Sequence, residues 1–190
     1  MTSLPEKAVA LEDALTAAGT PHAFGGALAL AFHIEEPRGT RDIDLNLFVP
    51  TNDARAVLGS LPNEVKWAER DVAEIERNGQ VRVFWEDTPI DLFFVTHPFH
   101  ENAAAHSEVV PFAGRTIPIL AADDLAVFKA FFDRTKDWAD IEAMLDAQSL
   151  DVHVVLGWLV DLLGADDHRV ARLKSLIGRD PQQTDPRFSP

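Results

Sequence analysis

The chain has 190 residues, of which 46% are hydrophobic and 25% are charged, a balance typical of a folded globular protein and unlike that of a disordered or collagen-like chain. It contains no cysteine, which excludes disulfides, thiolate zinc sites and cysteine nucleophiles and fits a cytoplasmic protein. The formal net charge is −14 at pH 7, so any site for phosphate has to be local. No apolar run reaches the roughly 20 residues that span a bilayer, so no membrane segment is expected.

The first half of the chain alternates between helix and strand patterns. Apolar spacing predicts a first helix from Pro5 to Ala18, and the alanine-rich stretch Ala27 to His33 predicts a second. Between Asp42 and Val49 polar and apolar residues alternate, as they do in a strand with one buried face. The further elements predicted here are a helix over 51–61, strands over 81–86 and 90–96 joined by a turn around 87–89, and a hairpin over 108–112 and 115–120.

The second half has helical patterns throughout. Asp123 or Asp124 can cap a helix that runs through Phe132, and apolar stripes predict further helices over 133–147, 152–163 and 166–177. We therefore expect an α/β fold, with a short mixed sheet flanked by helices over residues 1–120 and a C-terminal helical region over 121–180 that packs on this core. Residues 181–190, rich in proline, are expected to form a tail.

Two aspartates two residues apart are the strongest local signal for chemistry. Asp42 and Asp44 point to the same side of the predicted strand, where their charges repel each other unless a cation lies between them. Mg²⁺ prefers oxygen ligands and leaves coordination positions for phosphate oxygens, so such a pair can serve as a platform for a metal-bound nucleotide. A bare pair of this kind is also common on solvated strand faces, and that alternative stays open.

Two neighbouring features favour a nucleotide site. Gly25 and Gly26 stand between a strand-like segment and a helix, an arrangement in which backbone N–H groups can approach phosphates. Asp91 is the single carboxylate in an otherwise apolar strand, where an unpaired charge is unfavourable unless it faces a site. Asp91 can thus supply a third metal ligand or a base, although a glycine pair alone could be a simple turn.

The order of these motifs resembles that of the nucleotidyltransferase-fold superfamily. In detail the sequence is similar to the AbiEii-type toxin nucleotidyltransferases, including the mycobacterial MenT group, in three segments: Phe24 to Leu30, Arg38 to Asp44, and Lys129 to Ile141. It departs from them at Ala27, where many relatives carry a serine that contacts phosphate.

This resemblance implies metal-dependent transfer of a nucleotide from a nucleoside triphosphate (NTP) by an α/β core and a helical region that closes over the nucleotide. Asp42, Asp44 and Asp91 would hold Mg²⁺, or Mn²⁺ in its place, and Asp91 could also take a proton from the acceptor hydroxyl. Residues implied in nucleotide binding or phosphate neutralisation are Gly25, Gly26, Thr40, Arg41, Lys129, Arg134 and Lys136. Lys136, counted among the catalytic residues, could instead form a surface helix pair with Asp140.

The resemblance also implies partners and regulation. The acceptor would be RNA, with the 3′ end of tRNA as the favoured case, and the chain would be the toxin of a toxin–antitoxin pair, countered by a separate antitoxin protein. Phosphorylation of Thr40 would add negative charge beside the carboxylates and block NTP entry. The alternatives are transfer to a small molecule, as in aminoglycoside nucleotidyltransferases, transfer to a protein side chain, a module of this fold that only binds, and a nuclease.

Overall fold

The computed structural model describes residues 2–177, which form two compact units. The first unit ends at Ala121 and the second begins at Ala122. The helices of the first unit are α1 (Leu4–Ala17), α2 (Gly26–His33), the 3₁₀ turn η1 (Thr51–Asp53), α3 (Ala54–Ser60), α4 (Glu69–Asn78) and α5 (Phe99–His106). Its strands are β1 (His22–Phe24), β2 (Ile43–Pro50), β3 (Val65–Lys66), β4 (Gln80–Trp85), β5 (Thr88–Val95), β6 (Glu108–Phe112) and β7 (Arg115–Ile119).

All of these strands join one sheet of mixed direction, in the order β3-β4-β5-β2-β1-β7-β6. The central pair, β2 and β5, is parallel, as is the pair of β1 and β7, while the other neighbouring strands are antiparallel. The expected α/β class with a mixed sheet is therefore confirmed.

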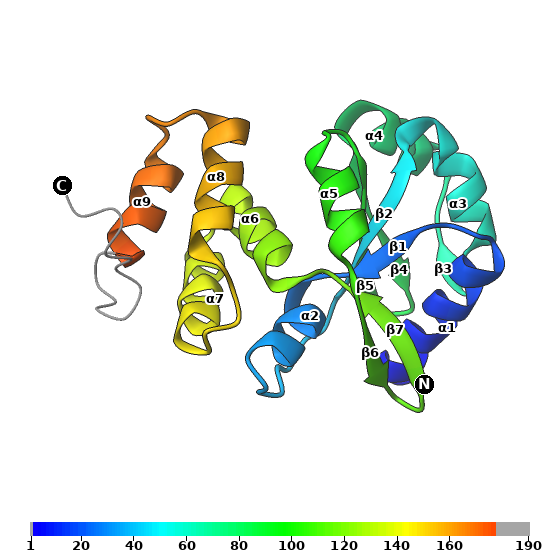
Figure 1. The fold of residues 1–190 in the computed structure, drawn as a ribbon. Coiled ribbons are helices and arrows are strands. Elements are labelled where there is room, and N and C mark those ends of the chain that lie inside the picture. The colour runs from blue at the N-terminus through cyan, green and yellow to red at the C-terminus, as the bar shows by residue number, and fades with distance from the viewer. Residues whose placement is uncertain (1, 178–190) are drawn as a thin grey trace. The chain divides into compact units, whose positions relative to one another are not determined.

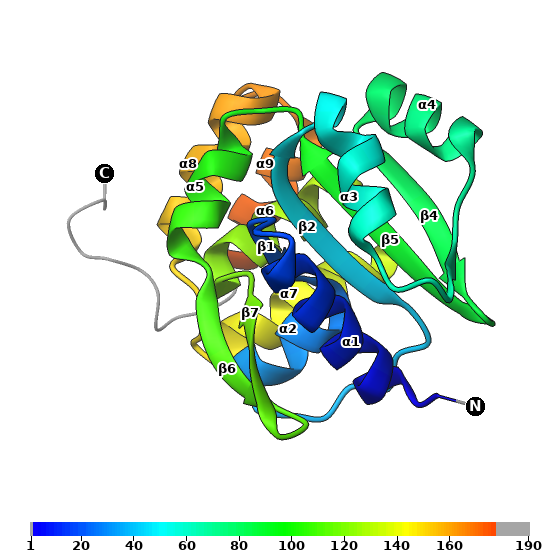
Figure 2. The same ribbon diagram turned by 90° about the vertical axis from the view of Figure 1, so that its right-hand side faces the viewer.

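The two faces of the central strands differ in burial. Along β2 and β5 the alternate residues Ile43, Leu45, Ile90 and Leu92 are at most 2% exposed and form the core under the sheet. Figures 1 and 2 show α1, α3 and α4 on one side of the sheet and α2 on the other. On the opposite face of these strands, toward α2, Asp44, Asp91 and Phe93 are partly exposed and Asn46 is buried, which leaves the region of the two aspartates available for a site.

A buried lysine of α1 forms hydrogen bonds and an ion pair with the hairpin of β4 and β5. The side chain of Lys7 is only 1% exposed, and its ammonium donates to the carbonyl oxygen of Trp85 (3.0 Å) and to Oγ1 of Thr88 (2.8 Å). It also pairs with Glu86 at 3.0 Å. Because each polar group here has a partner, the charge is tolerated inside the unit.

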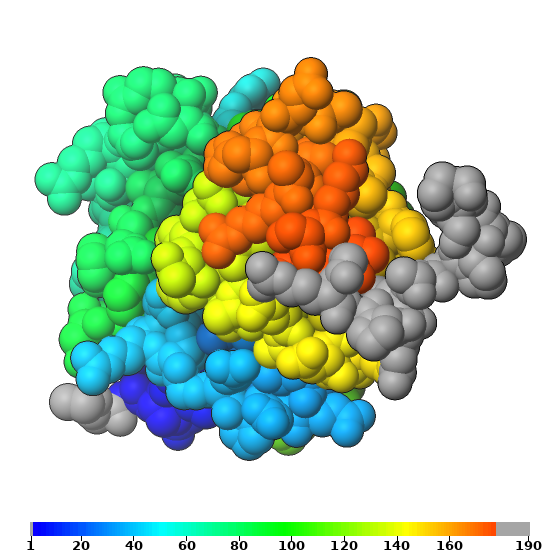
Figure 3. All heavy atoms as spheres, turned by 90° about the vertical axis from the view of Figure 1, so that its left-hand side faces the viewer, coloured from blue at the N-terminus to red at the C-terminus, as the bar shows by residue number. Residues whose placement is uncertain are grey.

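The second unit consists of α6 (Ala122–Phe132), α7 (Thr135–Asp146), α8 (Val152–Leu163) and α9 (His168–Ile177). In Figure 3, α9, in orange-red, lies beside α7, in yellow, and the guanidinium of Arg172 lies 4.6 Å from the centre of the Trp138 ring. Since α6 begins at Ala122, Asp123 and Asp124 are not its N-cap as expected but lie in its first turn. Asp123 instead accepts a hydrogen bond (2.7 Å) from the backbone N–H of Asp151.

One further boundary differs from the sequence expectation. The turn between β4 and β5 consists of Glu86 and Asp87, and Thr88 and Pro89 already belong to β5. The expected tail, residues 181–190, lies outside the described residues. Within the part of the chain described, no helix has the length and apolar character needed to cross a membrane.

Candidate active site

The three predicted carboxylates meet at one place on the α2 side of the sheet. Asp44 on β2 lies directly across from Asp91 on β5, and adjacent strands are about 4.8 Å apart. Asp42 directly precedes β2 and, two residues before Asp44, points to the same side. All three side chains are partly exposed. The structure therefore places Asp44 and Asp91 side by side and Asp42 near them, a cluster that we call the carboxylate edge, and their role as metal ligands stays a prediction.

The glycine pair lies directly against this edge. The N–H of Gly25 donates to the carbonyl oxygen of Asp44 at 2.9 Å, and Gly26 begins α2 with φ of +55°. A β-carbon at Gly26 would lie 1.7 Å from Oδ2 of Asp44, and one at Gly25 would lie 2.8 Å from Nδ2 of Asn46. Only glycine fits at position 26, both for its backbone conformation and for its closeness to the carboxylate. The N-terminus of α2 thus stands over the carboxylates, where its partial positive charge favours anions.

Arg82 is a member of the site that the sequence did not reveal. It lies on β4 directly across from Asp91, and its Nε and Nη2 donate to the two carboxylate oxygens of Asp91 at 2.7 Å each. These hydrogen bonds, followed by the nearby charges of Asp91, Asp42 and Asp44, raise the pKa of Arg82 above its usual range. A fixed positive charge therefore offsets part of the negative charge at this edge.

Thr40 positions Asp42 from the loop before β2. Its hydroxyl donates to Oδ1 of Asp42 at 2.5 Å and accepts from the Asp42 backbone N–H at 3.3 Å. This is the local turn bond common for threonine at the start of a strand. Arg41, the neighbouring residue, is exposed. Thr40 thus acts on a carboxylate of the site, and direct contact of Thr40 or Arg41 with a nucleotide stays a prediction.

The three basic residues of the late motif lie in the second unit. Lys129 is buried on α6, with its ammonium 2.7 Å from Oδ2 of Asp140, so the lysine paired with Asp140 is Lys129 and not Lys136 as we considered. Arg134 holds the buried carboxylate of Asp137, with Nε 2.6 Å from Oδ2. Lys136 is exposed on α7. Their part in binding a nucleotide stays a prediction.

The donor set at the edge suits a hard divalent cation. Carboxylate oxygens are the ligands that Mg²⁺ prefers, and the space that the missing β-carbon of Gly26 leaves is filled by the Asp44 carboxylate. Among residues 2–177, no three histidine, aspartate or glutamate side chains converge closely enough to hold an ion as they stand. Both oxygens of Asp91 are bound by Arg82, so a cation that uses Asp91 as a ligand has to displace this guanidinium.

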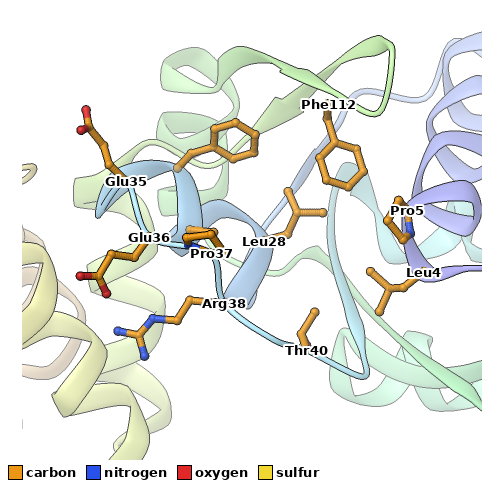
Figure 4. A pocket seen from close by; sticks show the side chains of 11 residues that line it. Leu4, Pro5, Leu28, Glu35, Glu36, Pro37, Arg38, Thr40 and Phe112 are labelled. Carbon is orange, nitrogen blue, oxygen red and sulfur yellow. The ribbon is translucent and has the colours of Figure 1, made fainter.

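A cavity of about 720 Å³ lies in the first unit, and the loop that carries Thr40 forms part of its wall (Figure 4). Its walls are mainly apolar and come from the start of α1, from α2, from the loop after α2 and from Phe112. Thr40 lines it, whereas the three carboxylates do not. The cavity is therefore separate from the carboxylate edge and touches it only through the residue that positions Asp42.

Comparisons with known proteins identify the fold. No family model matches the chain, and no curated protein sequence matches it. Several solved structures are similar to it, among them the following three. The antibiotic-resistance factor ANT(2″)-Ia has a TM-score of 0.53 at 16% identity over 90% of this chain and 95% of its own. The lincosamide antibiotic adenylyltransferase LnuA, bound to lincomycin, has a TM-score of 0.54 at 12% identity over 77% and 99%. An antigenic nucleotidyltransferase-like protein from Paracoccidioides brasiliensis has a TM-score of 0.51 at 16% identity over 90% and 94%. The chain has the nucleotidyltransferase fold.

Proposed function

We propose that this chain is a nucleotidyltransferase that moves a nucleoside monophosphate from an NTP to an acceptor hydroxyl, so that the new bond joins the acceptor oxygen to the α-phosphate and pyrophosphate leaves. The observation that carries the proposal is the register of Asp44 against Asp91, with Gly26 packed on the Asp44 carboxylate. Phosphoryl transfer needs charge stabilisation and positioning more than a protein nucleophile, and this edge offers carboxylates for a cation beside a helix N-terminus for phosphate.

Each residue of the edge has a role in this scheme. Asp42 and Asp44 would hold a divalent cation, Mg²⁺ or Mn²⁺, which when bound stabilises negative charge on the transferred phosphate. Asp91 would join them as a ligand and take the proton of the acceptor hydroxyl. Gly26 would present its backbone N–H to the phosphates at the start of α2, while Gly25, whose own N–H is bound to the Asp44 carbonyl, would let the phosphates approach the backbone closely.

The remaining roles come from the motif resemblance. Thr40 and Arg41, and in the second unit Lys129, Arg134 and Lys136, are proposed to bind the triphosphate on that ground alone. Lys136 is exposed and is the first of the three basic residues of the second unit to test, because its substitution should leave the fold intact.

For the acceptor we propose RNA, with the tRNA 3′ end as the favoured case, in a cytoplasmic toxin that is countered by an antitoxin protein. This step rests on the resemblance of three ordered motifs to the AbiEii-type toxins. A small-molecule acceptor is the second candidate. It is favoured by the net charge of −14, which suits a cationic acceptor, and by fold neighbours named for antibiotic resistance and for adenylylation of lincosamides.

One assay separates these possibilities. The purified protein is incubated with Mg²⁺ or Mn²⁺, each α-labelled NTP in turn, and either total tRNA or a panel of aminoglycosides and lincosamides. Asp44→Asn serves as the inactive variant, and Asp53→Asn, an exposed aspartate of η1, is the matched control. Label on tRNA that Asp44→Asn abolishes and Asp53→Asn retains would support the RNA acceptor.

Other outcomes have defined meanings. Label on an antibiotic would select the second candidate, and label on the protein would select a side-chain acceptor. NTP binding without transfer to any of these would contradict the enzyme proposal and leave a binding module.

A further inference from the structure

We propose that Arg82 is a positioning residue that holds Asp91 away from a divalent cation, so that the cation has to compete with the guanidinium for this carboxylate. The inference deepens the proposed function and rests on its assignment of Asp42, Asp44 and Asp91 to a cation site. It concerns the strength of cation binding, which can be measured without any transfer reaction.

The geometry of the pair is that of a strong, directional interaction. Nε and Nη2 of Arg82 donate in parallel to Oδ1 and Oδ2 of Asp91, each at 2.7 Å. Such two-bond contacts between arginine and a carboxylate fix the orientation of both groups, which a lysine cannot do. The two residues are also partners in the antiparallel register of β4 and β5, so the backbone itself holds them face to face.

The charges at the edge explain why a competitor is needed there. Asp44 and Asp91 are direct neighbours on parallel strands, and Asp42 lies two residues from Asp44. Like charges placed directly across from each other destabilise a sheet. Arg82 offsets this repulsion when no cation is bound. A divalent cation at Asp42 and Asp44 offers Asp91 a second partner, and the carboxylate cannot satisfy both equally.

Arginine stays protonated throughout the physiological pH range, so this competition is not a pH switch. The Arg82 side chain is also half exposed, at 53%, and lies on a strand that pairs through its backbone, so its replacement should not unfold the unit. Because Arg82 competes for Asp91, the site binds a cation more weakly than three carboxylates without the arginine would.

The experiment measures Mn²⁺ affinity in the absence of NTP and acceptor, by the loss of the free Mn²⁺ electron paramagnetic resonance signal. The proteins are the wild type, Arg82→Gln, Arg82→Lys, Asp91→Asn and the double variant Arg82→Gln/Asp91→Asn. Arg77→Gln is the matched control, because it removes an arginine of an exposed ion pair with Glu74 on α4.

We expect Arg82→Gln to bind Mn²⁺ about three- to tenfold more tightly than the wild type, Arg82→Lys to lie between them, and Arg77→Gln to be unchanged. Part of any gain comes simply from removing a positive charge. When Asp91 is replaced by Asn, only this charge effect should remain, so the gain in Mn²⁺ binding free energy caused by Arg82→Gln should be less than half of the gain seen when Asp91 is present.

Three results would overturn the proposal: an equal gain in the presence and absence of the Asp91 carboxylate, no gain at all, or no Mn²⁺ binding by the wild type. The first two results are distinct from failure of the proposed function, whereas the absence of Mn²⁺ binding would overturn the cation site on which both proposals rest. If transfer activity is found but Arg82→Gln leaves Mn²⁺ affinity unchanged, the competition is refuted and the enzyme stands. If the coupling between Arg82 and Asp91 is measured but no acceptor is ever labelled, the competition stands and the transfer reaction is refuted.

Discussion

Replacing Gly26 with alanine is the sharpest test of the carboxylate edge, because the new methyl group meets the proposed metal ligand itself. It would lie 1.7 Å from Oδ2 of Asp44, where ordinary van der Waals contact begins at 3.4 Å. The carboxylate oxygen would therefore have to move by about 1.7 Å to reach ordinary contact, and displacement of a reacting group by ~1 Å can cost ~100-fold in rate. The left-handed backbone, with φ of +55°, adds a folding cost of about 1–2 kcal/mol for alanine.

Gly19 offers a matched control for the backbone cost alone. It also has a left-handed backbone, with φ of +67°, but a β-carbon there meets nothing within 4 Å. Both alanine variants should lose about 1–2 kcal/mol of unfolding free energy, measured by urea denaturation. Only Gly26→Ala should also lose Mn²⁺ binding and about 100-fold in transfer rate. Equal activity of the two variants, whether both high or both low, would refute the argument that Gly26 is required by Asp44.

Three further outcomes are expected. Thr40→Val removes the hydroxyl that positions Asp42 and should weaken Mn²⁺ binding about tenfold, while Thr40→Ser should restore it; equal affinities would refute the role. Lys7→Met leaves buried acceptors unpaired and should lower the unfolding free energy by about 1–3 kcal/mol in urea titrations, without changing the activity of the folded protein. The hydrogen bond from His168 holds the pKa of Asp133 below its ordinary value of 3.8. The ionised carboxylate therefore stabilises the fold above pH 3.8, and this stabilisation is lost as the pH falls through the lowered pKa. Asp133→Asn should therefore lower the unfolding free energy at pH 7 by less than about 1 kcal/mol and match the wild type in acid. Urea titrations at several pH values measure this difference. A difference that persists in acid would show that ionisation of Asp133 is not its cause.

Local patterns predicted most of the elements and the carboxylate edge. Alternation identifies β2, and an apolar run with one carboxylate identifies β5. In the structure one face of each strand is buried, and Asp44 and Asp91 lie on the other face. The pairing of β2 with β5 could not be derived in this way, since it depends on how distant strands arrange themselves in the sheet. The sequence therefore suggested which carboxylates could meet, and the parallel register shows that they do.

Arg82 was missed because the turn before β5 was placed too late. In an antiparallel hairpin the turn fixes which residues face each other. A turn around residues 87–89 puts Asp91 across from Trp85, whereas the observed turn at Glu86 and Asp87 puts it across from Arg82. Pro89, which we took for a turn residue, lies within β5. The pairing of Arg82 with Asp91 could therefore have been derived from the sequence, but only if the position of the turn had been known to within one residue.

Tertiary packing accounts for the other differences. Spacing along one helix suggested Lys136 as the partner of Asp140, but packing of α6 against α7 brings the buried Lys129 to that carboxylate. A further helix, α4, was not predicted, although its two buried apolar residues, Val72 and Ile75, lie three residues apart on one face and charged residues surround them, as in an amphipathic helix. Its C-terminal end is marked by Gly79, which has a left-handed backbone.

The net charge of the carboxylate edge determines how binding of the cation, binding of the nucleotide and the position of Arg82 depend on one another. The three carboxylates outweigh the guanidinium of Arg82, which binds one of them, Asp91, so the edge is negative, and so is the protein as a whole. An NTP is itself an anion, so the negative carboxylate edge repels it unless additional positive charge is bound there. The exposed Arg41 beside Asp42 is too solvated to supply it alone. It follows that NTP binding should depend on prior or simultaneous binding of a divalent cation, and Arg82, by competing for Asp91, sets the cation concentration at which the nucleotide can enter.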